Sequence, residues 1–188
     1  SQDPLWTATR LAIAGNVIDF GIFTSVDIEG TIRKAINNPL AVDEFDIFKK
    51  AISDTDTILY LADNAGEIVF DRILIETLIS ADKKVTVVVK GSPVINDSTI
   101  EDALESALTG ICEVVDNGSD AVGTILPWTS SAFQKLFRNA EFIVSKGQGN
   151  FETLTGIQKN IFFLFQSKCD VVSKELGLST GSMLLKKS

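Results

Sequence analysis

The chain has 188 residues, of which 45% are hydrophobic and 22% charged, the usage of one ordinary globular domain with a sizeable core. Its formal net charge of −8 at pH 7 argues against binding to a nucleic-acid backbone, because such binding needs clustered lysine and arginine. The sequence contains no histidine, which excludes a Ser-His-Asp triad and most zinc sites. Any chemistry must therefore use carboxylates, amides, lysines and a hard metal ion.

The first part of the chain, residues 1–55, is predicted to be a helical segment. Residues 4–35 are mostly helical in pattern, with a break at Gly15-Asn16, and a second helix is expected near 27–36. Asn37-Asn38-Pro39 ends that helix, because proline and asparagine favour turns over helical continuation. A further short helix is expected over 43–53.

From residue 56 the pattern changes to strands that alternate with helices, which predicts an α/β domain over 56–188. Short apolar runs predict buried strands at 57–62, 84–89, 113–115, 141–144 and 161–166. Helices are expected over 67–80, 99–108, 130–139 and near 171–176. This alternation indicates a three-layer α/β/α sandwich with a mainly parallel, Rossmann-like sheet, preceded by helices.

Other features of the sequence indicate a cytoplasmic protein. No run of about 18 apolar residues predicts a membrane-spanning helix, so we expect no membrane partner. The first residues, 1–4, lack the basic and apolar regions of a signal peptide. The two cysteines, Cys112 and Cys169, allow one disulfide in principle, but we expect reduced structural thiols.

Polar residues gather directly after the five predicted strands. In an open parallel sheet, ligands bind beyond the carboxyl ends of the strands. We therefore expect these segments to open on one edge of the sheet, where they would bring together carboxylates, amides, glycines and lysines. The segments are 63–67, 90–97, 116–118, 145–150 and 167–168.

The chemistry of these segments suits a metal ion and a phosphate. Asp63, Asn64 and Asp97 offer two carboxylates and an amide oxygen, hard ligands that suit Mg²⁺ or Mn²⁺. Glu67 is placed to orient a water molecule or to support the ligands. The glycine-rich loop at 146–150 precedes a possible helix near Phe151, so its backbone N–H groups would cradle an anion.

Two lysines complete this hypothesis. Lys146, at the start of the glycine-rich loop, and Lys168, after the fifth strand, would contact the same anion. The set predicts attack of a metal-activated water on phosphorus, with the metal and the lysines neutralising charge on the transferring group.

Each element alone also has a structural interpretation. Asp63–Gly66 and Asp116–Gly118 are typical turns, and Asn96-Asp97 is a good helix cap. The loop at 146–150 lacks the GxxxxGK[ST] spacing of a P-loop, and a single lysine at a sheet edge is usually solvated. Their shared placement, rather than any single motif, favours a functional site.

The motifs at these positions resemble those of the damage-control phosphatases, a family of metal-dependent phosphatases. The resemblance lies in DNAGE (63–67), KGSPVINDST (90–99) and SKGQGNFE (145–152). GNVIDFG (15–21) and SKCDVVSKELG (167–177) resemble flanking motifs of that family, so the resemblance spans nearly the whole chain in order. It implies an α/β/α sandwich with a helical N-terminal portion.

The resemblance also implies roles for individual residues. A divalent metal (magnesium, manganese, cobalt or nickel) would be bound by Asp63, Asn64 and Asp97. Phosphate or sugar contacts would come from the glycine loop and the late lysine. With Asn16 of the first flanking motif, the predicted substrate-binding set is Asn16, Lys146, Gly147, Gln148, Asn150 and Lys168. Asp63, Asn64, Glu67 and Asp97 form the predicted catalytic set.

The expected substrates are small phosphorylated metabolites such as sugar phosphates. The chain departs from the family in two ways. Relatives carry a longer helical N-terminal region, often with a Cys-x-x-Cys motif, so we expect segment 1–55 to be truncated. Glu152 stands where some relatives that act on sugar phosphates carry a basic residue, so their substrate is a poor guide here.

Three other hypotheses come from different functional classes. A non-catalytic nucleotide- or metabolite-binding module would use the same Rossmann-like sheet, although the chain lacks GxGxxG. An interaction domain would present its acidic face to a basic partner and need no metal. A methyltransferase would bind S-adenosylmethionine without metal. The sequence does not predict the oligomeric state.

Overall fold

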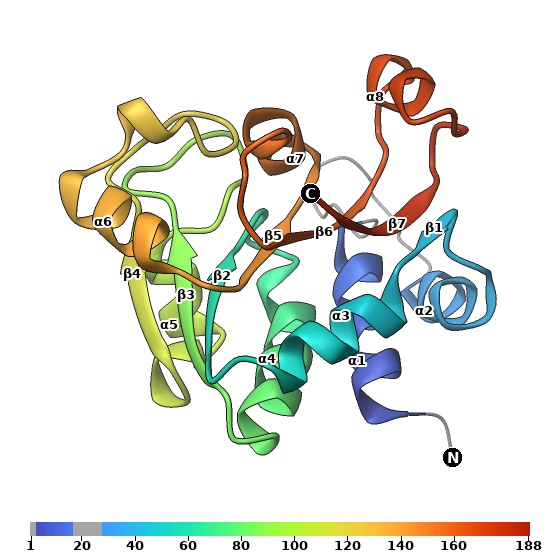
Figure 1. The fold of residues 1–188 in the computed structure, drawn as a ribbon, viewed down its shortest axis with the longest axis horizontal. Coiled ribbons are helices and arrows are strands. Elements are labelled where there is room, and N and C mark those ends of the chain that lie inside the picture. The colour runs from blue at the N-terminus through green and yellow to red at the C-terminus, as the bar shows by residue number, and fades with distance from the viewer. Residues whose placement is uncertain (1–2, 17–27) are drawn as a thin grey trace.

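The computed structural model describes residues 3–16 and 28–188 (Figure 1). Residues 1–2 and 17–27 lie outside the described residues. Residues 17–21 of the GNVIDFG motif therefore lie outside them too, as do residues 17–27 of the predicted helical region 4–35.

The described residues form a seven-stranded sheet with the order β1-β7-β6-β5-β2-β3-β4. Five neighbouring strands are mutually parallel: β2 (Thr57–Leu61), β3 (Lys84–Val89), β4 (Glu113–Asp116), β5 (Ile143–Lys146) and β6 (Ile161–Gln166). β7 (Met183–Lys187) pairs antiparallel with β6, and β1 (Val42–Asp43) pairs parallel with β7. The prediction of a mainly parallel sheet is confirmed, and the five carboxyl ends lie at one edge.

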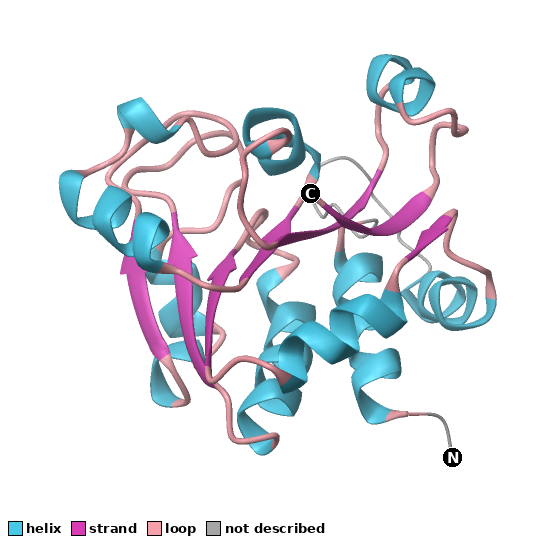
Figure 2. Ribbon diagram, viewed as in Figure 1, coloured by secondary structure: helices cyan, strands magenta, loops and turns pink. Residues whose placement is uncertain are grey.

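Helices cover both faces of the sheet (Figure 2), because alternate side chains of a strand point to opposite faces. In β2, Ile58 and Tyr60 enter one hydrophobic core, while Leu59 and Leu61 enter the other. The first core includes residues of α1 (Pro4–Gly15), α3 (Phe45–Ser53), α4 (Ile68–Ser80) and α5 (Ile100–Glu105). The second includes residues of α6 (Ser131–Asn139), α7 (Gln148–Leu154) and α8 (Asp170–Glu175). α2 (Ile28–Asn37) contacts α1, and short 3₁₀ turns lie at Leu108–Gly110 and Leu126–Trp128.

Several element boundaries differ from the prediction, most clearly those of β5 and α5. The strand predicted at 141–144 is β5 at 143–146, so Ser145 and Lys146 belong to the strand rather than to the following loop. Both residues are fully buried. Their polar side chains led to the loop prediction, but ion pairs with Glu67 and Asp71 stabilise the buried ammonium of Lys146. The helix predicted over 99–108 ends at Glu105, because Ala107 adopts a left-handed conformation with φ 55°.

Strands β1 and β7 were not predicted. β1 has only two residues, too few to leave a periodic pattern. β7 begins with Met183-Leu184-Leu185, a short apolar run followed by two lysines. Its strand conformation depends on antiparallel pairing with β6, in which Phe162 lies opposite Lys187 and Gln166 lies opposite Met183. Such long-range pairing is not visible in local sequence.

Both cysteines of the chain, Cys112 and Cys169, are free and half-buried. Burial raises the pKa of the Cys112 thiol to about 11, which disfavours the reactive thiolate. No helix among residues 3–16 and 28–188 is long and apolar enough to cross a bilayer.

The predicted domain boundary at residue 55 lies between α3 and β2. Side chains of α1 and α3 nevertheless share one hydrophobic core with the parallel strands. Phe48 of α3 is fully buried, with its ring centroid 5.1 Å from that of Phe162 and 5.9 Å from that of Phe142. These rings attach α3 to the sheet.

We therefore expect Phe48→Ala to lower the free energy of unfolding by about 3–5 kcal/mol, because it leaves a cavity among aromatic rings. Urea denaturation followed by circular dichroism measures the change. Trp128→Ala is the matched control, since its side chain is 66% exposed and its loss should cost within about 0.5 kcal/mol. A loss below about 1 kcal/mol for Phe48→Ala would show that α3 is not an integral part of this core.

Candidate metal and phosphate site

The candidate site lies where the strand order of the sheet reverses. From β2 the chain proceeds through β3 to β4, and then returns to β5 on the other side of β2. Ligands of open α/β sheets bind at such switch points, beyond the carboxyl ends of the strands. The segments that follow β2 and β5 begin with Ala62-Asp63 and Gly147, and these two segments meet.

Gly147 makes room for the carboxylate of Asp63. Its φ of 80° is left-handed, and a Cβ built on it would lie 2.0 Å from Oδ2 and 2.1 Å from Cγ of Asp63. Any other residue would displace the carboxylate or the backbone. Glycine is therefore required here by both conformation and contact.

A short β-bridge brings a third loop to the same place. Asn64 and Asp97 pair in antiparallel fashion, with the Ala65 N–H donating to the Asn96 carbonyl at 2.8 Å. The Ser98 N–H donates to the Asp63 carbonyl at 2.7 Å. The bridge thus joins the three residues predicted as metal ligands, Asp63, Asn64 and Asp97.

Glu67 lies beneath these residues, with its two oxygens in different interactions. Oε1 accepts N–H groups from the amides of Asn64, at 2.6 Å, and Asn16. Asn16 also donates to Asp63 Oδ2 at 3.1 Å, and its own oxygen accepts from the Gln166 N–H at 3.1 Å. Asn16, predicted as a substrate-binding residue, is fully buried in this network.

Lys146 lies in β5 with a fully buried side chain, not in an exposed glycine loop. Its Nζ lies 3.1 Å from Glu67 Oε2 and 2.6 Å from Asp71 Oδ1. The hydroxyl of Tyr60 donates to the same Asp71 oxygen at 2.8 Å. Sequence reasoning missed Asp71 and Tyr60, although Asp71 follows Glu67 at the i, i+4 spacing that places both on one helical face.

Asn150, the third amide of the predicted substrate set, joins the ends of β2 and β5. It donates to the carbonyls of Lys146, at 2.8 Å, and Ala62, at 3.2 Å. Its oxygen accepts from the Thr124 hydroxyl at 2.7 Å. These bonds give Asn150 a structural role, and a direct substrate contact remains a prediction.

Gln148 and Lys168 link the start of α7 to the segment after β6. The Lys168 backbone N–H donates to Gln148 Oε1 at 2.6 Å, and Gln148 Nε2 donates to Glu152 at 2.6 Å. Burial raises the pKa values of Asp63 and Asp97, and the charge of the exposed Lys168 side chain opposes both rises. Its ammonium therefore lies within electrostatic range of both carboxylates.

The carboxylates of the site are crowded. Burial raises the pKa of Asp63 well above its usual value, and the charges of Glu67 and Asp97 raise it further, against the effect of the lysines. Burial also raises the pKa of Asp97, opposed by Lys90, whose Nζ lies 3.2 Å from Asp97 Oδ2. Lys90 donates in addition to the carbonyls of Ala121 and Gly123, and sequence reasoning did not single it out.

This arrangement fits a hard divalent cation. In the described residues, no three His, Cys, Asp or Glu side chains form a metal-binding group, so the set needs the Asn64 amide beside the two aspartates. Carboxylate and amide oxygens are ligands that such cations prefer. A cation would also relieve the repulsion that raises the pKa of Asp63.

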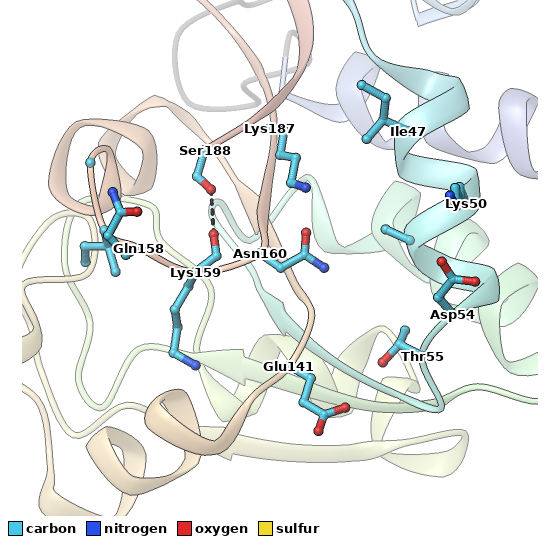
Figure 3. A pocket seen from close by; sticks show the side chains of 13 residues that line it. Ile47, Lys50, Asp54, Thr55, Glu141, Gln158, Lys159, Asn160, Lys187 and Ser188 are labelled. Carbon is cyan, nitrogen blue, oxygen red and sulfur yellow. Dashed lines mark hydrogen bonds between the residues drawn. The ribbon is translucent and has the colours of Figure 1, made fainter.

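A pocket of about 790 Å³ lies elsewhere, at the opposite edge of the sheet (Figure 3). Thr55, Glu141 and Asn160, which precede β2, β5 and β6, contribute to its wall. The lining mixes ammonium and carboxylate groups, and it includes none of the predicted site residues. The candidate site is therefore defined by its clustered carboxylates, and it lies outside this pocket.

The close contact at Gly147 generates a prediction with an internal control. Gly147→Ala and Gly156→Ala both place a side chain at positive φ, 80° and 81°, but a Cβ at Gly156 has nothing within 4 Å. Both variants should lose about 1 kcal/mol of stability from backbone strain. Only Gly147→Ala should also displace Asp63 and weaken Mn²⁺ binding, measured by titration calorimetry, at least about tenfold. Equal Mn²⁺ affinity in the two variants would contradict this role of Gly147.

The buried carboxyl of Asp71 should make the stability of the protein depend on pH. Burial raises the pKa of Asp71 to about 6 although Lys146 lowers it, whereas an unfolded aspartate titrates near its ordinary value of 3.8. The folded state thus binds more protons than the unfolded state between these values, so stability should fall as pH rises from about 4 to about 6. Urea midpoints in a chelator should show this slope in the wild type and a shallower one in Asp71→Asn. An unchanged slope in the variant would remove Asp71 as its source.

Comparison with known proteins identifies relatives of this chain. The family model described as damage-control phosphatase ARMT1-like domain matches residues 1–184. A damage-control phosphatase of Pyrococcus horikoshii is 38% identical over 180 residues, which cover 94% of this chain and 63% of that protein. An uncharacterized protein of Methanocaldococcus jannaschii is 41% identical over 182 residues, covering 93% of this chain and 60% of that protein.

A solved structure is also similar. The crystal structure of the DUF89 family protein from Pyrococcus horikoshii matches with a TM-score of 0.90 and 37% identity, covering 97% of this chain and 65% of that one. The chain thus spans about three fifths of the length of the curated relatives it matches. On these matches, this chain belongs to the damage-control phosphatase ARMT1-like family.

Proposed function

We propose that residues 56–188 are the catalytic α/β domain of a metal-dependent phosphatase that hydrolyses small phosphorylated metabolites. One observation carries the proposal: at the switch point of a parallel sheet, Asn64 is bridged to Asp97 and donates to the Asp63 carboxylate, which the charge of Asp97 also reaches. Relatives named as damage-control phosphatases support it. Because those relatives are longer than this chain, the activity of the whole protein is part of the proposal.

In this proposal, Asp63, Asn64 and Asp97 hold a divalent cation, which is magnesium, manganese, cobalt or nickel. Such a cation supplies charge neutralisation at the phosphoryl group and lowers the pKa of the attacking water. Glu67 and Asn16 hold the Asp63–Asn64 pair in place through their hydrogen bonds. Gly147 keeps the Asp63 carboxylate close to the end of β5.

Lys168 is the group that we assign to the substrate phosphate. It is exposed at the same edge, and its positive charge acts on both aspartates of the site. An ammonium there would attract the phosphate of a small metabolite despite the chain's net charge of −8. Water attack on phosphorus would then release inorganic phosphate and the alcohol, and sugar phosphates are the first substrates to test.

Replacement of either aspartate tests the proposal. We expect Asp63→Asn and Asp97→Asn to reduce metal-dependent phosphate release at least about 100-fold, because each removes a negatively charged ligand. Release is measured in the full-length protein with p-nitrophenyl phosphate and a panel of sugar phosphates, with Mg²⁺, Mn²⁺, Co²⁺ or Ni²⁺ and a chelator control. Asp120→Asn, an exposed aspartate after β4, is the matched control and should retain full activity.

The outcomes separate the competing functions. Phosphate release that survives the chelator or either aspartate variant would contradict the ligand assignment. If the folded protein releases no phosphate with any metal, a binding module becomes the better hypothesis. Binding of S-adenosylmethionine without metal would instead favour a methyltransferase.

A further inference from the structure

A buried ion-pair cluster lies directly beneath the candidate site. The side chains of Lys146, Glu67 and Asp71 are at most 1% exposed, and the ammonium contacts both carboxylates. Charged groups are costly to remove from water unless their partners satisfy them closely. The two short contacts to Lys146 therefore fix where Glu67 lies in the structure.

The fixed carboxylate of Glu67 in turn orients the amide of Asn64. With Oε2 facing Lys146, Oε1 faces Asn64 and accepts its N–H at 2.6 Å. Asn64 Nδ2 donates its second hydrogen to Asp63 Oδ2 at 3.2 Å. Because the NH₂ group is held by these two carboxylates, the amide oxygen of Asn64 must point away from Glu67.

The orientation of this amide decides whether Asn64 can bind a cation. An amide offers one oxygen that binds metal ions and one NH₂ group that repels them. If the amide turned over, its oxygen would face the carboxylates of Asp63 and Glu67, and the NH₂ group would take the position from which the oxygen would contact the cation. A group that holds the amide in one orientation therefore controls cation affinity without contacting the cation.

We propose that Lys146 is a positioning residue that acts through Glu67 to hold the Asn64 amide with its oxygen toward the cation. The inference rests on the proposed function, because it takes Asn64 as a cation ligand. It also gives Lys146 a purpose other than contact with phosphate, which its buried position in β5 does not favour. Tyr60 and Asp71 complete the support, since the Tyr60 hydroxyl and Lys146 share one Asp71 oxygen.

Glu67→Gln provides a test with a definite direction. A glutamine has a single acceptor oxygen, and Lys146, which can only donate, should bind it. The new NH₂ group would then face the NH₂ group of Asn64, and the Asn64 amide should turn over. We expect Mn²⁺ affinity, measured by titration calorimetry without substrate, to fall about 10- to 100-fold.

The double variant Glu67→Gln/Lys146→Met should restore binding. Methionine does not donate, so the introduced glutamine is free to turn its oxygen back to Asn64 and to donate to Asp71 instead. We expect Mn²⁺ affinity to be within about threefold of the wild type. A merely structural role for Lys146 predicts the opposite, because the second substitution would then add to the damage.

The results separate this inference from the proposed function. If the Asp97→Asn variant binds Mn²⁺ as tightly as the wild type does, the proposed ligand set is wrong, and so is the proposed phosphatase site. Loss of binding in Asp97→Asn but not in Glu67→Gln would overturn only the positioning role. The same holds if the double variant binds no better than Glu67→Gln.

If the double variant does not fold, hydrogen exchange in the wild type gives a second test. The side-chain NH₂ protons of Asn64 donate to two carboxylates, so they should exchange much more slowly than those of the exposed Asn139. Glu67→Gln should remove this protection, as measured on ¹⁵N-labelled protein. Exchange in wild-type Asn64 as fast as in Asn139 would overturn the inference.

Discussion

The contact on which the rest of the site depends is the pairing of Lys146 with Glu67 and Asp71. A fully buried ammonium is tolerated in β5 because two carboxylates of α4 and its N-terminal cap lie within 3.1 Å of it. In return, the ammonium fixes α4 against the end of β5. Glu67 then holds the amides of Asn16 and Asn64, which belong to two other segments. One buried charge thus connects four parts of the chain.

Sheet topology explains why this cluster lies beneath the candidate site. β2 and β5 are neighbours in space although β3 and β4 separate them in sequence, so their two following loops converge. The bridge between Asn64 and Asp97 adds the loop after β3. Gly147 allows this close packing, because it leaves space for the Asp63 carboxylate where any other side chain would project. The result is a group of crowded carboxylates whose mutual repulsion a cation would relieve.

The polar residues of this edge divide into two groups. Asn150, Gln148 and Lys90 bond mainly to carbonyls and neighbouring side chains, which holds the loops in register. Asp63, Asp97 and Lys168 carry the charges that a metal ion and a phosphate would meet.

The sequence by itself determined the layered α/β architecture, the parallel direction of five strands and the edge at which their polar loops gather. Those features follow from local periodicity, since apolar runs of strand length must be buried and parallel strands share one edge. Only the tertiary structure decided the burial of Lys146, its partnership with Asp71 and Tyr60, and the structural bonds of Asn150. It also decided the pairing of β7 and the end of β5. These depend on contacts between residues far apart in the chain, and a lysine that finds buried carboxylates has the same local sequence as one that faces solvent.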